Sequence, residues 1–156
     1  MSVKEIITVP DEILRKHSTE VEKVGKNEKN LIKNLFDTMY ASKGIGLAAI
    51  QIGVPKRIVV IDVSNKEQEK KPICLINPII FKKSSETSVY EEGCLSIPNT
   101  FIEIERPKKV WIEYIDQNGN GIWDEDEDFI DALNGIYDEG EDFIDALNGG
   151  YDEGED

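Results

Sequence analysis

The sequence predicts an α+β domain with a mostly antiparallel sheet, followed by an acidic tail. Apolar residues recur at helical spacing early in the chain, several short apolar stretches of strand character follow them, and residues 116–156 contain no Lys or Arg. A helix that precedes a run of strands, without regular alternation of the two, is typical of α+β domains. A length of 156 residues with 39% hydrophobic content suffices for one domain with a core.

Two helical stretches are expected before residue 45. Pro10-Asp11-Glu12 opens a short one, and Asn27 is placed to cap a longer one. Flexible backbone at residues 43–46 would end the longer helix. Its apolar stripe, which would face the core, consists of Leu31, Ile32, Leu35, Phe36, Met39 and Tyr40.

The expected strands are short, rich in β-branched or aromatic residues and separated by polar or turn-forming residues. Residues 57–63 form an apolar run that indicates a buried strand, and a polar linker, residues 64–71, follows it. The remaining strands are expected at residues 73–77, 79–82, 87–90, 101–105 and 110–115.

Charge divides the chain into two parts. Residues 1–115 contain all 18 Lys and Arg and 16 of the 32 Asp and Glu, so their net charge is +2, whereas residues 116–156 have a net charge of −16. Such asymmetry indicates a separate tail whose natural partners are cations. A field of this sign argues against a nucleic-acid partner.

Neither a membrane span nor a secretory signal is expected. No stretch approaches the roughly 20 apolar residues of a membrane helix, and the N-terminus lacks the apolar run of a signal peptide. We therefore expect a cytoplasmic protein. Its two cysteines, Cys74 and Cys94, are too few for a disulfide framework, so each is either a core residue or a ligand.

From Trp123 onwards the sequence repeats with a period of 14 residues. The units are WDEDEDFIDALNGI, YDEGEDFIDALNGG and YDEGED. Each unit has few apolar residues, which indicates an acidic array rather than a solenoid with its own core.

Two sequence clusters could carry chemistry. In Gly44-Ile-Gly-Leu-Ala-Ala-Ile-Gln51, the glycines would let a substrate backbone approach and the glutamine amide could donate to an oxygen that gains negative charge; the alternative is a helix C-cap with a tight turn. In Glu91-Glu-Gly-Cys-Leu-Ser-Ile-Pro98, the thiolate of Cys94 is a good ligand for Zn²⁺ or Fe²⁺; the alternative is a small buried hydrophobe. Cys74, inside an apolar run, is expected in the core.

Together, GIGLAAIQ and EEGCLSIP resemble the first two signature motifs of the peptide deformylase family. Supporting matches are Pro10-Asp11 with Leu14-Arg15, the run from Gln51 to Pro55, Asn77-Pro78, and Glu105-Arg106-Pro107 before a strand. The family's reaction is metal-dependent hydrolysis of the formyl group from the N-terminal methionine of nascent proteins, a hydrolase step of protein biosynthesis. The resemblance implies a peptide-deformylase-like fold over residues 1–119, with a formyl-methionyl peptide as partner and Fe²⁺ or Zn²⁺ as cofactor.

The resemblance also implies roles for individual residues. Cys94 would be a metal ligand, and Gln51 and the Leu95 amide would bind the oxyanion. Gly46 would pair with the substrate backbone. The family's supporting ion pair would be formed by Glu92 and Arg106.

The third family motif, a helix carrying His-Glu-x-x-His, is missing from the sequence. That motif would supply two imidazole ligands and the carboxylate that moves the proton of metal-bound water. The one histidine, His17, is expected at the surface. Because a catalytic metal normally needs about three protein ligands, we expect an inactive, truncated deformylase-like domain at residues 1–119 and an acidic repeat tail at residues 120–156, which replaces the catalytic helix. Phe129, Ile130 and Leu133 are predicted to dock on the apolar face that this helix would cover.

A predicted calcium loop, residues 116–127, spans the junction of the two parts. It fits the pattern D-x-[DN]-x-[DN]-G-x₅-E at every defined position. The alternative is a solvated acidic turn. The ligands would be Asp116, Asn118, Asn120, the Ile122 carbonyl, Asp124 and Glu127.

Three functional hypotheses follow. The first is a deformylase-derived domain that is inactive as written. The second is a non-catalytic calcium-binding protein. The third is a fusion or chimeric coding sequence joined at the Asp-Gln-Asn-Gly turn, where the resemblance ends.

Overall fold

The computed structural model describes residues 2–64 and 70–119. Within them it contains one long helix, two short 3₁₀ helices and six strands. In chain order these elements are η1 (Glu12–Arg15), α1 (Lys26–Ala41), β1 (Gly46–Ala48), η2 (Ala49–Ile52), β2 (Ile58–Ile61), β3 (Ile73–Lys83), β4 (Thr87–Cys94), β5 (Ile97–Pro107) and β6 (Val110–Ile115).

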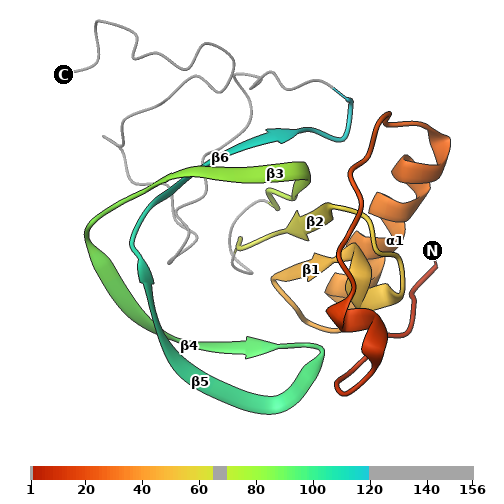
Figure 1. The fold of residues 1–156 in the computed structure, drawn as a ribbon. Coiled ribbons are helices and arrows are strands. Elements are labelled where there is room, and N and C mark those ends of the chain that lie inside the picture. The colour runs from red at the N-terminus through yellow and green to blue at the C-terminus, as the bar shows by residue number, and fades with distance from the viewer. Residues whose placement is uncertain (1, 65–69, 120–156) are drawn as a thin grey trace, which may run out of the picture.

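Two antiparallel sheets organise these strands. One has the order β1-β2-β3-β6, and the other is the β4–β5 ribbon. Figure 1 shows that β3 and β6 run on into β4 and β5 as one curved band, which leads away from α1. The prediction of an α+β fold with a mostly antiparallel sheet is therefore confirmed.

The core lies between α1 and the first three strands of the larger sheet. Ile32, Leu35 and Met39 recur at the spacing of one helical face, and all three are buried. Their partners across the core are Leu47 of β1, Ile58 and Val60 of β2, and Cys74 and Ile76 of β3. The prediction that the apolar stripe of this helix faces the core is thus confirmed.

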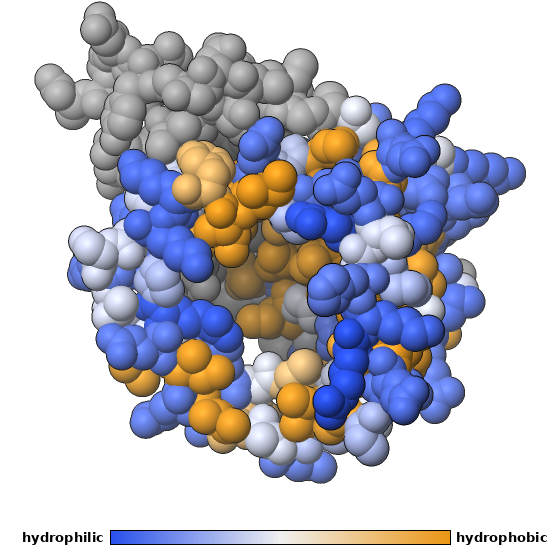
Figure 2. Space-filling model, viewed as in Figure 1, coloured by the Kyte–Doolittle hydropathy of each residue, from blue (hydrophilic) through white to orange (hydrophobic). Residues whose placement is uncertain are grey.

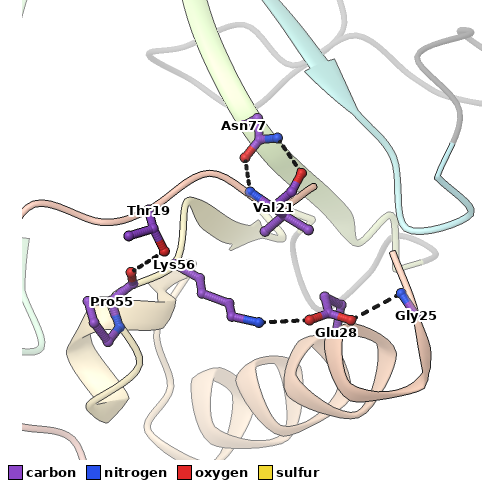
Figure 3. Close-up of polar contacts among 7 residues, drawn as sticks. All are labelled: Thr19, Val21, Gly25, Glu28, Pro55, Lys56 and Asn77. Carbon is purple, nitrogen blue, oxygen red and sulfur yellow. Dashed lines mark hydrogen bonds and ion pairs between the residues drawn. The ribbon is translucent and has the colours of Figure 1, made fainter. Parts of the chain in front are cut away.

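Polar contacts fix the segment before α1 to β3 and to the first turn of α1 (Figure 3). The side chain of Asn77 in β3 accepts from the amide of Val21 and donates to its carbonyl, both at 2.9 Å. Glu28 in the first turn of α1 accepts from Gly25 N at 3.1 Å and pairs with Lys56 at 2.7 Å. These contacts set the position of α1 against the sheet.

Several predicted boundaries were wrong. The long helix begins after Gly25, so Asn27 lies inside it, because the Glu28 side chain caps the Gly25 amide. The predicted strand 57–63 is shorter, Ile58–Ile61, and residues 73–77 and 79–82 form one strand, β3, with irregular pairing between Ile76 and Ile79. The strands predicted at 87–90 and 101–105 are longer, and β1 was not predicted.

Within the described ranges, no helix has both the length and the apolar character required to cross a lipid bilayer.

Candidate functional site

The first motif forms an edge strand followed by a 3₁₀ turn. In the described part of the chain, β1 pairs only with β2, with Gly46 opposite Ile61. The turn η2 begins directly after β1 and contains Gln51. The Gln51 side chain folds back so that its Oε1 accepts from the Ala48 amide at 2.9 Å. The expected tight turn is therefore present, but a strand precedes it.

The second motif forms the tip of the β4–β5 ribbon. Cys94 and Ile97 are opposite each other, and Leu95 and Ser96 are the two residues of the turn between them. Cys94 is exposed and Ser96 is buried. The alternative interpretation of Cys94 as a small buried hydrophobe is therefore wrong.

The Gln51 amide joins the two motifs. Its Nε2 donates to Ser96 Oγ at 3.0 Å and contacts Cys94 Sγ at 3.7 Å. Because Oε1 already accepts a backbone N–H, the orientation of the amide is fixed, with its nitrogen towards the second motif. Residues that are 43 apart in the sequence thus meet through one side chain.

Backbone hydrogen bonds from residues 7–9 also connect the two motifs. The amide of Ile7 donates to the Gln51 carbonyl at 2.8 Å, and the amide of Val9 donates to the Ser96 carbonyl at 2.9 Å. Residues 7–9 therefore connect η2 to the ribbon turn and limit the movement of one motif relative to the other.

The glycines beside the site make room for protein side chains. A Cβ at Gly44 would lie 2.7 Å from Leu95 Cδ1, and a Cβ at Gly93 would lie 2.7 Å from the Phe101 ring. We expected the glycines of the first motif, Gly44 and Gly46, to admit a substrate backbone. At Gly44 the structure instead shows close approach of Leu95, and Gly93, for which no such role was predicted, is approached by Phe101.

Glu92 and Arg106 form a two-point ion pair on the ribbon. The Arg106 guanidinium donates through Nε and Nη2 to the two carboxylate oxygens of Glu92, the second contact at 2.7 Å. Hydrogen bonding by Arg106 lowers the pKa of Glu92, and the carboxylate raises the pKa of Arg106. The ion pair links β4 to β5, and Glu92 lies two residues before Cys94 in β4.

The described residues do not fit a catalytic Fe²⁺ or Zn²⁺ ion. Within residues 2–64 and 70–119, no three His, Cys, Asp or Glu side chains converge as a metal site. His17 is exposed, as predicted. Cys74 is a core residue, also as predicted, and burial followed by the charge of Asp116 raises its pKa to about 12, so it does not supply a thiolate.

The predicted calcium loop lies mostly outside the described residues. Asp116 is buried, and its carboxylate accepts from the Asn118 amide at 2.8 Å and from Asn118 Nδ2 at 3.2 Å. The other four predicted ligands lie outside the described residues, as do Phe129, Ile130 and Leu133; these four are Asn120, Ile122, Asp124 and Glu127. Calcium binding therefore stays a prediction.

Sequence reasoning missed one residue of the site and assigned a different role to another. Ser96, which was given no role, anchors the Gln51 amide. Gly44, expected to admit a substrate backbone, makes the space that Leu95 occupies. The presence of Ser96 inside the second motif was the available signal, because a hydroxyl two residues from Cys94 can lie beside the same partner.

Comparison with known proteins identifies the fold and the family. The family model described as polypeptide deformylase matches residues 3–134. The peptide deformylase of Pelagibacter ubique is 56% identical over 119 residues, which cover 76% of this chain and 69% of that protein. The peptide deformylase of Rhizobium meliloti is 50% identical over 119 residues, with 76% and 68% covered.

Solved structures agree with these matches. The peptide deformylase from Ehrlichia chaffeensis in complex with actinonin has a TM-score of 0.72 at 46% identity, covering 77% of this chain and 72% of that one. The peptide deformylase from Thermotoga maritima has a TM-score of 0.71 at 40% identity, covering 77% and 78%. On its fold, its two motifs and these identities, the chain belongs to the peptide deformylase family.

Proposed function

We propose that this chain binds the formyl-methionyl end of nascent peptides in the cytoplasm and does not hydrolyse the formyl group unaided. Family membership supports the choice of ligand. The ordered contacts between Gln51 and the ribbon turn support binding. The ligand count supports the lack of turnover.

The observation that carries the proposal is the single metal ligand. Of the family's three expected ligands, the sequence supplies Cys94 and no His-Glu-x-x-His. The described residues provide no replacement cluster. One thiolate is too few protein ligands to hold a hydrolytic metal ion.

The chain's own residues still suit recognition of a peptide end. Among the described strands β1 lies at the edge of its sheet, and an edge strand offers backbone groups to an extended peptide. Gln51 Nε2 carries two donors, one used by Ser96 and the other directed at sulfur. Because sulfur is a weak acceptor, a formyl oxygen would replace the contact to Cys94 rather than the one to Ser96. The Leu95 amide is the proposed second donor.

The test combines binding, turnover and metal analysis on the full chain. Labelled formyl-Met-Ala-Ser should bind more tightly than unformylated Met-Ala-Ser in fluorescence polarisation. Formate release should stay below about 10⁻³ s⁻¹ after incubation with Fe²⁺, Ni²⁺ or Zn²⁺, against roughly 10 s⁻¹ for a typical enzyme. A deformylase that contains His-Glu-x-x-His is the positive control.

Each outcome has a definite meaning. Stoichiometric Fe, Ni or Zn together with turnover would refute the lack of activity. Equal binding of the formylated and free peptides would refute the proposed recognition. Bound calcium with neither peptide binding nor turnover would favour the calcium-binding hypothesis, and sequencing of the source locus through codon 120 tests the fusion hypothesis.

A further inference from the structure

Large apolar side chains lie exposed along the curved band of β3, β4 and β5. Figure 2, in the same view as Figure 1, shows a hollow at the centre of this face with apolar side chains around it. Successive side chains of a strand point to opposite faces, so Val89 and Tyr90, like Phe101 and Ile102, lie on opposite faces of the band. Each face therefore has exposed apolar side chains that an occupant would cover. The residues, each 49–66% exposed, are Ile79, Ile80, Phe81, Val89, Tyr90, Phe101 and Ile102.

The exposure begins within one strand. In β3, residues up to Ile76 are buried or half-buried, while Ile79, Ile80 and Phe81 are about half exposed. The inner half of β3 pairs with β2 and contributes Cys74 and Ile76 to the core, but among the described residues only β6 pairs with the outer half. A binding surface is thus centred on the outer half of β3.

We propose that residues 128–133 of this chain, which lie within the first acidic repeat unit (residues 123–136), dock on this surface. The repeat contains Phe129, Ile130 and Leu133, and a helix would place all three on one side. It therefore combines an apolar side with carboxylates, which suits an apolar surface that has basic neighbours.

The path of the chain permits this docking. Ile115, the last residue of β6, is opposite Ile76, and Ile80 lies about 13 Å farther along β3 at the usual rise per residue. The ten or so residues between Gly119 and Phe129 can span up to about 33 Å. The linker thus reaches the surface with length to spare.

Charge favours the same occupant. Lys82 and Lys83 end β3, and Lys108 and Lys109 precede β6. Two acids lie among these four basic residues: Glu86, which pairs with Lys108 at 3.0 Å, and Glu113, which is opposite Ile79, so the basic residues outnumber the acids at this end of the sheet. The segment after residue 115 has a net charge of −16 and no basic residue. Attraction between the two would be strongest at low salt.

The indole N–H of Trp111, beside the outer half of β3, also supports docking of an acidic segment. Trp111, opposite Lys82, has a buried Nε1 with no hydrogen-bond partner among the described residues. A buried donor normally has an acceptor. The carboxylates of the repeat are acceptors of the required kind.

The test uses two matched variants of the full chain. One carries Phe129→Ser, Ile130→Ser and Leu133→Ser; the control carries Phe143→Ser, Ile144→Ser and Leu147→Ser in the second unit, where residues 142–147 have the same sequence as residues 128–133. Both lose the same side chains and keep the same charge. The first should raise the fluorescence of bound anilinonaphthalene sulfonate about threefold, whereas the control should not.

Hydrogen exchange locates the effect. Peptides covering residues 79–83 should exchange about tenfold faster in the first variant than in the control. Circular dichroism checks folding, and if the triple variant unfolds, the milder pair Phe129→Ala and Phe143→Ala replaces it.

Three results would overturn the proposal. The first is an equal increase of dye fluorescence in the two variants. The second is strong dye binding by the unmodified chain. The third is a dimer in light scattering in which residues 79–83 stay protected from hydrogen exchange in both variants. The last result would assign the surface to a second copy of the chain.

Discussion

Replacing Gly44 with alanine tests whether Leu95 is positioned by the first motif. A Cβ at Gly44 would lie 2.7 Å from Leu95 Cδ1 and 3.5 Å from its Cγ. Real Cβ atoms do not approach so closely, so Leu95 must move. Because Leu95 packs against the core, its movement disturbs the ribbon turn that contains Ser96.

Two opposing effects determine how much Gly44→Ala changes the free energy of unfolding. Overpacking of this kind typically costs about 1–3 kcal/mol. The loss of backbone freedom in the unfolded chain returns about 0.4–1 kcal/mol, since the φ angle of Gly44 is not in the left-handed region. We therefore expect Gly44→Ala to lower the free energy of unfolding by roughly 1–2 kcal/mol.

Urea unfolding followed by circular dichroism provides the assay, and two other glycines provide controls. At Gly46 the nearest atom to a new Cβ is 3.6 Å away, so Gly46→Ala should change stability by less than about 0.5 kcal/mol. Gly93→Ala should also be mild, because the ring that it would meet, Phe101, is 66% exposed and can turn into solvent.

A double-mutant cycle tests whether Leu95 is the side chain that the new methyl group at residue 44 meets. In a Leu95→Ala background the contact no longer exists, so Gly44→Ala should cost nothing beyond about 0.5 kcal/mol. If Gly44→Ala is as mild as Gly46→Ala in the unmodified chain, or equally costly in both backgrounds, the steric reasoning is refuted.

Three further predictions concern polar groups. Ser96→Ala removes the acceptor of Gln51 Nε2 and should cost about 1–2 kcal/mol in urea unfolding; no loss would mean that water replaces the hydroxyl. Arg106→Gln should cost only about 0.5 kcal/mol at pH 7, because the pair is partly exposed. Since the pKa of Glu92 is lowered in the folded state from its usual 4.5, this stabilisation is present above pH 4.5 and is lost as the pH falls through the lowered pKa; a difference between the two proteins that persists at pH 2 would contradict it. Equilibrium dialysis should show calcium binding that Glu127→Gln weakens at least about tenfold, and an unmodified chain that retains no calcium would exclude the site.

The spacing of apolar residues in the sequence predicted the long helix, α1, because one face of this helix packs on the core. The apolar stripe of α1 is visible in the sequence because each helical turn contributes to the same face. The cap was predicted at Asn27, yet the Glu28 side chain caps Gly25, because a carboxylate three residues into a helix can reach back to the preceding amide.

Strand β1 depends on a tertiary contact and could not be predicted in the same way. Its three residues, Gly46–Ala48, are too few to show alternation, and they become a strand only by pairing with β2. Ser96 was missed for a related reason. Its role depends on Gln51, which lies 45 residues earlier in the sequence.

The contacts around Gln51 support the proposal that a formylated peptide binds without a complete metal site. The Gln51 side chain is fixed by Ala48 and Ser96, and its carbonyl is fixed by Ile7, through hydrogen bonds of 2.8–3.0 Å that involve no metal ligand. Cys94, by contrast, is exposed and contacts Gln51 only at 3.7 Å. Replacing Cys94 with serine should therefore leave both stability and binding of a formylated peptide nearly unchanged, whereas Gln51→Leu should weaken that binding. If the two substitutions weakened binding equally, the thiol itself would have to take part in holding the ligand.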